Sequence, residues 1–149
     1  MNKWVKVIFW IVFGAWLIFL TILSSEDGFS TSQTSGKFTV FFMVLFHIPK
    51  VYHDRVEMIL RISAHFVGFF VLGWLLYSAM RFTWAKSERI HLWAWGFCGI
   101  LGIMDEVKKV FIAGRHLSWE EAGLNIIGAW CGIIIVMIVI EQWYCISRS

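Results

Sequence analysis

Four runs of apolar residues divide this chain, and charged residues separate them. Three runs contain no Asp, Glu, Lys or Arg for 19 positions and the fourth for 15; the runs are 7–25, 62–80, 122–140 and 90–104. A membrane-spanning helix needs about 20 mostly apolar residues, so the three long runs predict spans. The short run covers about 22 Å at a rise of 1.5 Å per residue, against a hydrocarbon core of about 30 Å. Either the bilayer thins around that run, or the carboxylates that follow it lie below the membrane surface.

The pattern predicts an all-α fold, a single domain over residues 1–149 that forms a four-helix transmembrane bundle. We expect the spans at about 5–25, 61–81, 90–107 and 120–141. The apolar stretch 38–48 is too short to cross and predicts an interfacial or re-entrant helix between the first two spans. Pro49 ends that stretch. The whole interfacial segment is expected at about 38–60, bending into the second span.

Local signals predict a loop, a turn and two helix starts. The polar stretch 26–36 contains Gly, Ser and Thr and is typical of a loop. Gly114 predicts a turn or a helix end. Capping-box spacing, which marks the start of a helix, occurs at Asp54 with Glu57 and at Ser118 with Glu121.

The composition decides between a soluble and a membrane protein. Hydrophobic residues make up 59% of the chain and charged residues 15%, whereas a soluble domain is about 45–50% apolar and about 25% charged. The polar surface is too small to cover this excess in water. An ordinary soluble enzyme, a disordered tail and a nucleic-acid binder are therefore excluded. Three cysteines also exclude a disulfide scaffold.

Basic residues predict the orientation. With the N-terminus inside, the inner segments 1–6, 81–89 and 141–149 hold six Lys and Arg in 24 residues. The outer segments, 26–61 and 105–121, hold seven in 53 residues. Basic residues favour the inner side, so we expect a multi-pass protein of the cytoplasmic membrane with both termini cytoplasmic.

Ionisable and amide side chains converge at the outer ends of the expected spans. His65 lies in the first turn of the second span, Asn125 in the first turn of the last, and Asp105 with Glu106 closes the third. These four side chains then share one membrane depth, where charged groups usually face the protein interior or a wet cavity. Arg115, on the connecting loop, could close over such a cavity.

Each of these residues also has a plainer interpretation. Asp105 can pair with Lys108 or Lys109, three and four residues on. Its pair with Lys109 can be only a surface ion pair worth less than about 1 kcal/mol. Glu121 can act only as a helix cap, and His65 can simply hydrogen-bond a neighbouring helix. The sequence has no H-x-x-x-H or H-E-x-x-H pattern, so no metal or other cofactor is expected.

The last two expected spans contain several glycines, which have no side chain. Gly128 and Gly132 form a G-x-x-x-G motif, and Gly96, Gly99 and Gly102 lie in the third span. Small residues let membrane helices approach closely. We expect packing between the third and fourth spans within one chain, with a homodimer through Gly128 and Gly132 as the alternative.

Two stretches of this sequence resemble the VanZ-like family of small bacterial membrane proteins. Arg61-Ile62-Ser63-Ala64-His65-Phe66, followed by Leu72-Gly73, is similar to the family's Ala-His-Phe entry into the second span. The second stretch is similar to the family's Asp-Glu, Gly-Arg, Asp and Asn-x-x-Gly series; it holds Asp105-Glu106, Phe111, Gly114-Arg115, Glu121, Asn125 and Gly128. The resemblance covers about residues 24–132.

The chain departs from the family pattern at four positions. Ile62 stands where the family often has Lys, and Lys109 where it commonly has Gln. Both changes alter the charge and hydrogen bonding of the expected pocket. Ala113 replaces a Pro, and Glu121 replaces an Asp but keeps a carboxylate.

The resemblance implies a role in the bacterial envelope, because the family is named for a protein that raises resistance to teicoplanin, a lipoglycopeptide. Our first hypothesis is a non-enzymatic module that binds an amphiphile, either the lipoglycopeptide, a membrane lipid or a lipid-linked peptidoglycan precursor. Lys108, Lys109 and Arg115 would meet anionic groups, and residues 38–48 would meet the acyl part. The expected ligand-binding residues are His65, Asp105, Glu106, Lys109, Arg115, Glu121 and Asn125.

The alternative hypothesis is an intramembrane hydrolase or transferase that acts on a lipid-linked cell-wall precursor. His65 with Asp105 or Glu106 would form the acid–base pair, and Arg115 would clamp a phosphate. Paired carboxylates and a histidine at membrane depth are the kind of groups that catalytic sites use. We favour the binding module.

Overall fold

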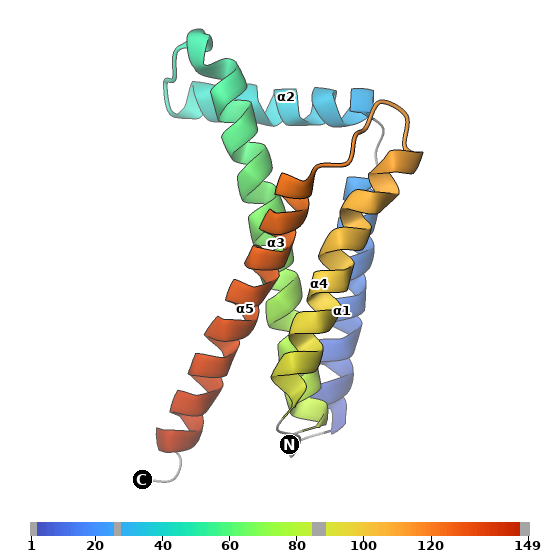
Figure 1. Ribbon diagram of the computed structural model, residues 1–149. Coiled ribbons are helices and arrows are strands. Elements are labelled where there is room, and N and C mark those ends of the chain that lie inside the picture. The colour runs from blue at the N-terminus through green and yellow to red at the C-terminus, as the bar shows by residue number, and fades with distance from the viewer. Residues whose placement is uncertain (1–2, 26–27, 85–88, 147–149) are drawn as a thin grey trace.

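The computed structural model describes residues 3–25, 28–84 and 89–146, and these ranges form five α-helices without a strand. Four of the helices run along the length of the molecule and one lies across an end (Figure 1). The long ones are α1 (Lys3–Ser24), α3 (His53–Thr83), α4 (Ile90–Val107) and α5 (Trp119–Ile146). The crossing helix is α2 (Gly28–Leu45). The beginning of α1 and the end of α5 both lie at the end of the molecule opposite α2 (Figure 1).

Helix α3 is the centre of the arrangement, because it packs against each of the other four helices. Helix α4 also packs on α5, so α3, α4 and α5 share one core. Two indole groups attach α1 to α3. The Trp10 indole N–H donates a hydrogen bond to the Thr83 hydroxyl, and the Trp16 indole N–H donates one to the Gly68 carbonyl; each is 2.9 Å long.

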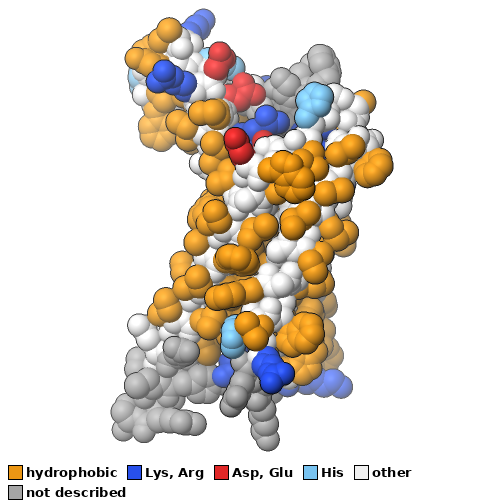
Figure 2. Space-filling view, viewed as in Figure 1, with side chains coloured by type: hydrophobic (Ala, Val, Ile, Leu, Met, Phe, Trp, Pro, Cys, Tyr) orange, Lys and Arg blue, Asp and Glu red, His pale blue; other side chains and the backbone are white. Residues whose placement is uncertain are grey.

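Three helices are long and apolar enough to cross a membrane. They are Lys3–Ser24, Lys50–Thr83 and Trp119–Ile140. Helix α4 is not one of them; its 18 residues span about 27 Å. Its last turn contains the two carboxylates that follow the short apolar run, and both are buried in protein. Between the two ends of the molecule, most of the coloured side chains visible in Figure 2 are apolar.

The prediction of a loop over 26–36 is wrong from Gly28 onward, where the chain is helical. Glu26 and Asp27 lie outside the described residues. Packing on α3 favours the helix, since α2 contacts α3 and two of its own residues, Thr39 and Met43, are buried. Tertiary contacts of this kind override the weak helix propensity of Gly, Ser and Thr.

The expected interfacial segment 38–60 is two separate pieces. Helix α2 ends at Leu45, His47 adopts a left-handed φ of 54°, and Pro49 precedes a short 3₁₀ turn, Lys50–Tyr52. Helix α3 then begins at His53 and continues without a break for 31 residues. At about 46 Å it is longer than a hydrocarbon core.

Two smaller expectations about helix starts are also wrong. His65 lies in the fourth turn of α3 rather than in its first, because α3 starts at residue 53. The Asp54–Glu57 capping box does not form: Asp54 is exposed, and the Glu57 carboxylate accepts a hydrogen bond from Ser35 of α2 at 2.7 Å. Glu57 thus holds α2 on α3 instead of capping α3.

The G-x-x-x-G motif packs against α3, not against α4 as expected. A Cβ atom at Gly128 would lie 2.5 Å from the Phe66 carbonyl oxygen, and one at Gly132 would lie 2.1 Å from that of Phe70. Gly102 of α4 does face α5 as expected, against Ile126 and Asn125. A homodimer through Gly128 and Gly132 stays a prediction, although α3 covers that face of α5 in the single chain.

We predict that Gly132→Ala lowers the free energy of unfolding by about 1–3 kcal/mol, because its methyl group forces α3 and α5 apart. Thermal unfolding of the purified protein in detergent measures the change. Gly99→Ala is the matched control, since nothing lies within 4 Å of a Cβ atom there, and it should keep or raise stability. Equal losses in both variants would contradict the close α3–α5 contact.

Candidate functional site

Charged side chains of both signs gather at the end of the molecule where α2 lies, and a second basic group lies at the other end (Figure 2). Three segments meet beneath α2. Helix α3 contributes Arg61 and His65, which are four residues apart and therefore share one helix face. The end of α4 and the following 3₁₀ turn, Lys108–Phe111, contribute acidic and basic residues. The first turns of α5 contribute Glu121 and Asn125.

A buried ammonium group joins two of these segments. The Lys109 side chain is only 1% exposed. Its Nζ atom donates one hydrogen bond to Glu106 Oε1 and another, 2.7 Å long, to Glu121 Oε2. Glu106 is also fully buried, and its second oxygen accepts from the Ser118 backbone N–H at 3.4 Å. Buried charges are tolerated only when paired and hydrogen-bonded. The Glu106–Lys109–Glu121 bridge therefore locks the end of α4 to the start of α5.

Of the two lysines expected as partners of Asp105, Lys108 forms the ion pair, at 2.9 Å. Lys109 pairs with Glu106 and Glu121 instead. Lys108 Nζ also donates to the Thr21 carbonyl of α1 at 3.1 Å. Asp105 is buried, so this pair is not a surface ion pair; it connects α1 to α4.

His65 is held on both sides of its ring. Its Nδ1 atom lies 3.0 Å from Asn125 Oδ1, and its Nε2 atom lies 3.2 Å from Glu121 Oε2. The Asn125 amide nitrogen faces two acceptors, the Gly102 carbonyl and Asp105 Oδ2, each at 3.5 Å. Because an amide nitrogen only donates, these contacts turn the Asn125 oxygen toward His65. Neither nitrogen of His65 is then available without breaking a contact.

The Glu121 carboxylate is the common point of the network. Besides His65 and Lys109, it faces Arg61, whose Nε atom lies 3.5 Å from Glu121 Oε1. The predicted cap at the start of α5 is half confirmed: the Ser118 hydroxyl accepts from the Glu121 N–H at 3.3 Å. The Glu121 carboxylate does not accept from the Ser118 N–H, as a capping box would require, because it faces His65, Lys109 and Arg61 instead. The Ser118 N–H donates to Glu106. Gly114, with a φ of 72°, forms the predicted turn.

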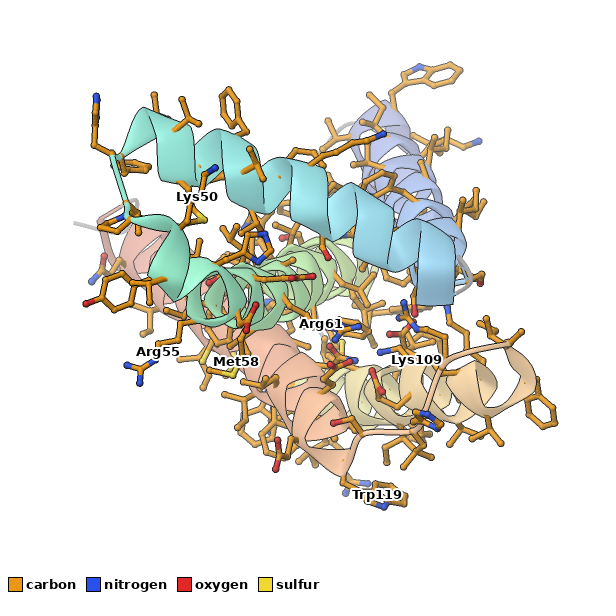
Figure 3. All side chains as sticks on the ribbon, turned by 90° about the horizontal axis from the view of Figure 1, so that it is seen from above. Lys50, Arg55, Met58, Arg61, Lys109 and Trp119 are labelled. Carbon is orange, nitrogen blue, oxygen red and sulfur yellow. The ribbon has the colours of Figure 1, made fainter. Side chains whose placement is uncertain are left out.

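A cavity of about 370 Å³ lies beside this network, between the end of α1, the underside of α2 and α3. That volume is within the usual range for small-molecule sites. Its apolar lining is Leu20, Leu23, Phe38, Phe42, Leu60, Ala64 and Phe69. Its polar lining is Ser24, Ser35, Arg61, His65, Asp105 and Arg115. In Figure 3, Arg61 and Lys109 lie near the centre of the helices, whereas Arg55 points outward.

All seven residues expected from the sequence therefore lie at this end of the protein, in two layers. His65, Asp105 and Arg115 line the cavity. The hydrogen-bonded layer behind them consists of Glu106, Lys109, Glu121 and Asn125. Whether any of them binds a ligand stays a prediction.

Sequence reasoning missed three polar residues of the cavity wall, Ser24, Ser35 and Arg61. Arg61 was available from its spacing, because a residue four before His65 must share its helix face. Ser24 could not be found in this way, since its place in the wall depends on how α2 crosses α1 and α3.

His65, Asp105 and Glu106 offer ligand atoms that lie within 4.8 Å of one another, a spacing that could hold a metal ion. Glu106, however, binds the Lys109 ammonium, which already supplies a positive charge there. Both nitrogens of His65 are also engaged. The arrangement therefore works best as a fixed frame of charges beside the cavity.

The family match covers most of the chain. Residues 9–140 match the sequence profile of the VanZ/LLP1 family. The chain belongs to the VanZ/LLP1 family. Searches of curated proteins and of solved structures give no match. The matched range contains the whole cavity lining and the network behind it. Family membership and the apolar helices together make this a VanZ-like membrane protein.

We predict that Lys109→Met lowers the free energy of unfolding by about 3–5 kcal/mol, because it leaves the fully buried Glu106 carboxylate without its ammonium partner. Thermal unfolding in detergent is the measurement. Lys50→Met is the control, because Lys50 is exposed and lies outside the network, so the loss should be clearly smaller. A Lys109→Met protein as stable as Lys50→Met would show that the bridge does not hold the helices.

Proposed function

We propose that this VanZ-like protein binds an amphiphile with an anionic headgroup in the cavity under α2 and so contributes to resistance against lipoglycopeptides such as teicoplanin. The observation that carries the proposal is the lining of the cavity. Apolar side chains from α1, α2 and α3 enclose one part, and Arg61 and Arg115 line the polar part. A membrane lipid, a lipid-linked peptidoglycan precursor and an acylated antibiotic all combine these two chemical halves.

In this proposal the residues divide the work. Guanidinium groups suit phosphate and carboxylate because their donors are planar and paired, so Arg61 and Arg115 would meet the anion. Phe38 and Phe42 would meet the acyl part. Lys109 is bound by two carboxylates, so it would position Glu106 and Glu121 rather than touch the ligand.

The two departures that alter charge have different consequences. Ile62 is exposed and does not line the cavity. A lysine missing there leaves the wall of the cavity unchanged. Lys109 does change the network, but Glu106 and Glu121 bind its charge. Both features are compatible with a working site.

An intramembrane enzyme is the second candidate, and the close approach of His65, Asp105 and Glu106 is the observation that favours it. The purified protein would then turn over undecaprenyl-linked substrates, with or without a divalent metal. Full engagement of His65 by Asn125 and Glu121 supports binding over catalysis. An assay without turnover under both conditions would remove the enzyme from consideration.

We also propose that four helices cross the membrane, with α2 on the outer side and both termini in the cytoplasm. The end opposite α2 carries basic residues at the start of α1, the end of α3 and the start of α4, namely Lys3, Lys6, Arg81 and Arg89. Cytoplasmic ends of membrane helices are enriched in such residues.

Cysteine labelling on intact cells tests this orientation. In a variant with the three native cysteines replaced, Lys50→Cys should react with a membrane-impermeant maleimide. Arg89→Cys should react only after the membrane is permeabilised, because it lies at the opposite end. Both positions are exposed, so the difference reports sidedness. The reverse pattern would invert the topology.

The resistance role is tested by teicoplanin and vancomycin susceptibility of a sensitive Gram-positive host that expresses the gene at matched levels. We expect the wild-type gene to protect against teicoplanin and Asp105→Asn or Arg115→Gln to abolish protection. The charge-assisted hydrogen bond lost in Arg115→Gln should weaken ligand binding by about tenfold to a hundredfold. Asp105→Asn removes the charge that holds Lys108 and faces the Asn125 amide. Arg55→Gln is the control, because Arg55 is exposed and points away from the site (Figure 3). Full protection by the Asp105 and Arg115 variants would reject the cavity as the site.

A further inference from the structure

The size of the cavity limits what can occupy it. A water molecule occupies roughly 30 Å³, and we take a similar volume for each non-hydrogen atom of a ligand. The 370 Å³ of the cavity then holds about 12 such atoms. A phosphate group takes about five of these places, which leaves about seven for carbon atoms. The cavity therefore has room for one headgroup and the first part of one chain, and the remainder of that chain would extend into the bilayer.

The walls also favour a single chain. Leu20 and Leu23 of α1 stand on one side and Phe38 and Phe42 of α2 on the other, with Phe69 of α3 between them. Both α1 and α2 are attached to the rest of the protein through α3. The apolar part is thus a single space between two helices with the charged groups at one end.

One polar atom of the wall lacks a partner. The Ser24 hydroxyl is buried and makes no hydrogen bond to any of the described residues. Ser35, the other serine of the lining, already donates to Glu57, and neighbouring Ser25 donates to the Thr21 carbonyl. A buried hydroxyl without a partner is costly. A ligand in the cavity would supply the missing partner.

From these observations we infer that the occupant is a single-chain anionic amphiphile and that the Ser24 hydroxyl hydrogen-bonds its headgroup beside Arg61 and Arg115. This inference rests on the proposed function and narrows its ligand class. A lysophospholipid of the membrane and an acylated glycopeptide share this chemistry.

Native mass spectrometry of the full-length protein, released from a neutral maltoside detergent, tests the chain number. Dodecyl phosphate should bind saturably with one molecule per chain. Didodecyl phosphate, with the same headgroup and two chains, should bind at least about tenfold more weakly. Arg61→Gln combined with Arg115→Gln gives the background level of phosphate adducts.

Three serine variants test the headgroup contact. Ser24→Ala should weaken dodecyl phosphate binding about tenfold, the usual effect of one hydrogen bond to a charged group. Its thermal stability without ligand should stay the same or rise, because an unpaired buried hydroxyl is removed. Ser24→Leu should block binding by filling the cavity. Ser25→Leu is the matched control, since Ser25 is exposed and does not line the cavity.

Competition then separates the two sources of the ligand. Displacement of dodecyl phosphate by teicoplanin but not by lysophosphatidylglycerol assigns the site to the antibiotic, and the reverse assigns it to a membrane lipid; both support the inference. Equal binding of one-chain and two-chain phosphates, or full binding by Ser24→Ala, overturns the inference but leaves the proposed function standing. Binding of neither phosphate above the arginine-variant background overturns both.

Discussion

The ammonium group of Lys109, shared between Glu106 and Glu121, is the interaction on which the polar end of this protein depends. It is buried where a short helix ends and a long one begins, and it compensates carboxylates from both. Glu121 also connects this bridge to α3, because its carboxylate faces His65 and Arg61 and so helps to hold their side chains in position. The polar wall of the cavity is consequently fixed by groups that lie behind it. A wall built in this way is preorganised, and little ordering is needed when a ligand binds.

The apolar wall has a different origin. Helix α2 is held by α3, through buried Thr39 and Met43 and through the Ser35–Glu57 hydrogen bond. Because α2 crosses the end of α1 instead of running along it (Figure 1), a space remains between the two helices. The length of α3 makes this arrangement possible, since its first turns reach past the other long helices to meet α2.

Hydropathy and charge were enough to predict the long helices and the convergence of His65, Asp105 and Asn125, because both depend only on where apolar runs begin and end. Partner choice was not predictable. Asp105 has a lysine three residues on and another four residues on. Lys109 binds Glu121 instead of Asp105, and this choice depends on where α5 places Glu121 in space. The helical form of residues 28–36 likewise depends on contacts with α3. The G-x-x-x-G motif indicated close packing but carried no information on which helix it meets.

In the proposed four-span topology, the short length of α4 and the two carboxylates in its last turn have a consequence for how the chain enters the membrane during synthesis. This helix falls outside the set that qualifies to cross by length and composition, and its last turn carries two carboxylates. Charged groups at membrane depth are costly in isolation. The groups that stabilise the end of α4 come later in the chain. Glu121, which accepts the second hydrogen bond of Lys109, and the surface that packs on α4 both belong to α5. They are present only after α5 has been synthesised. In the proposed four-span topology, we therefore expect α4 to insert stably only together with α5, as one helical hairpin.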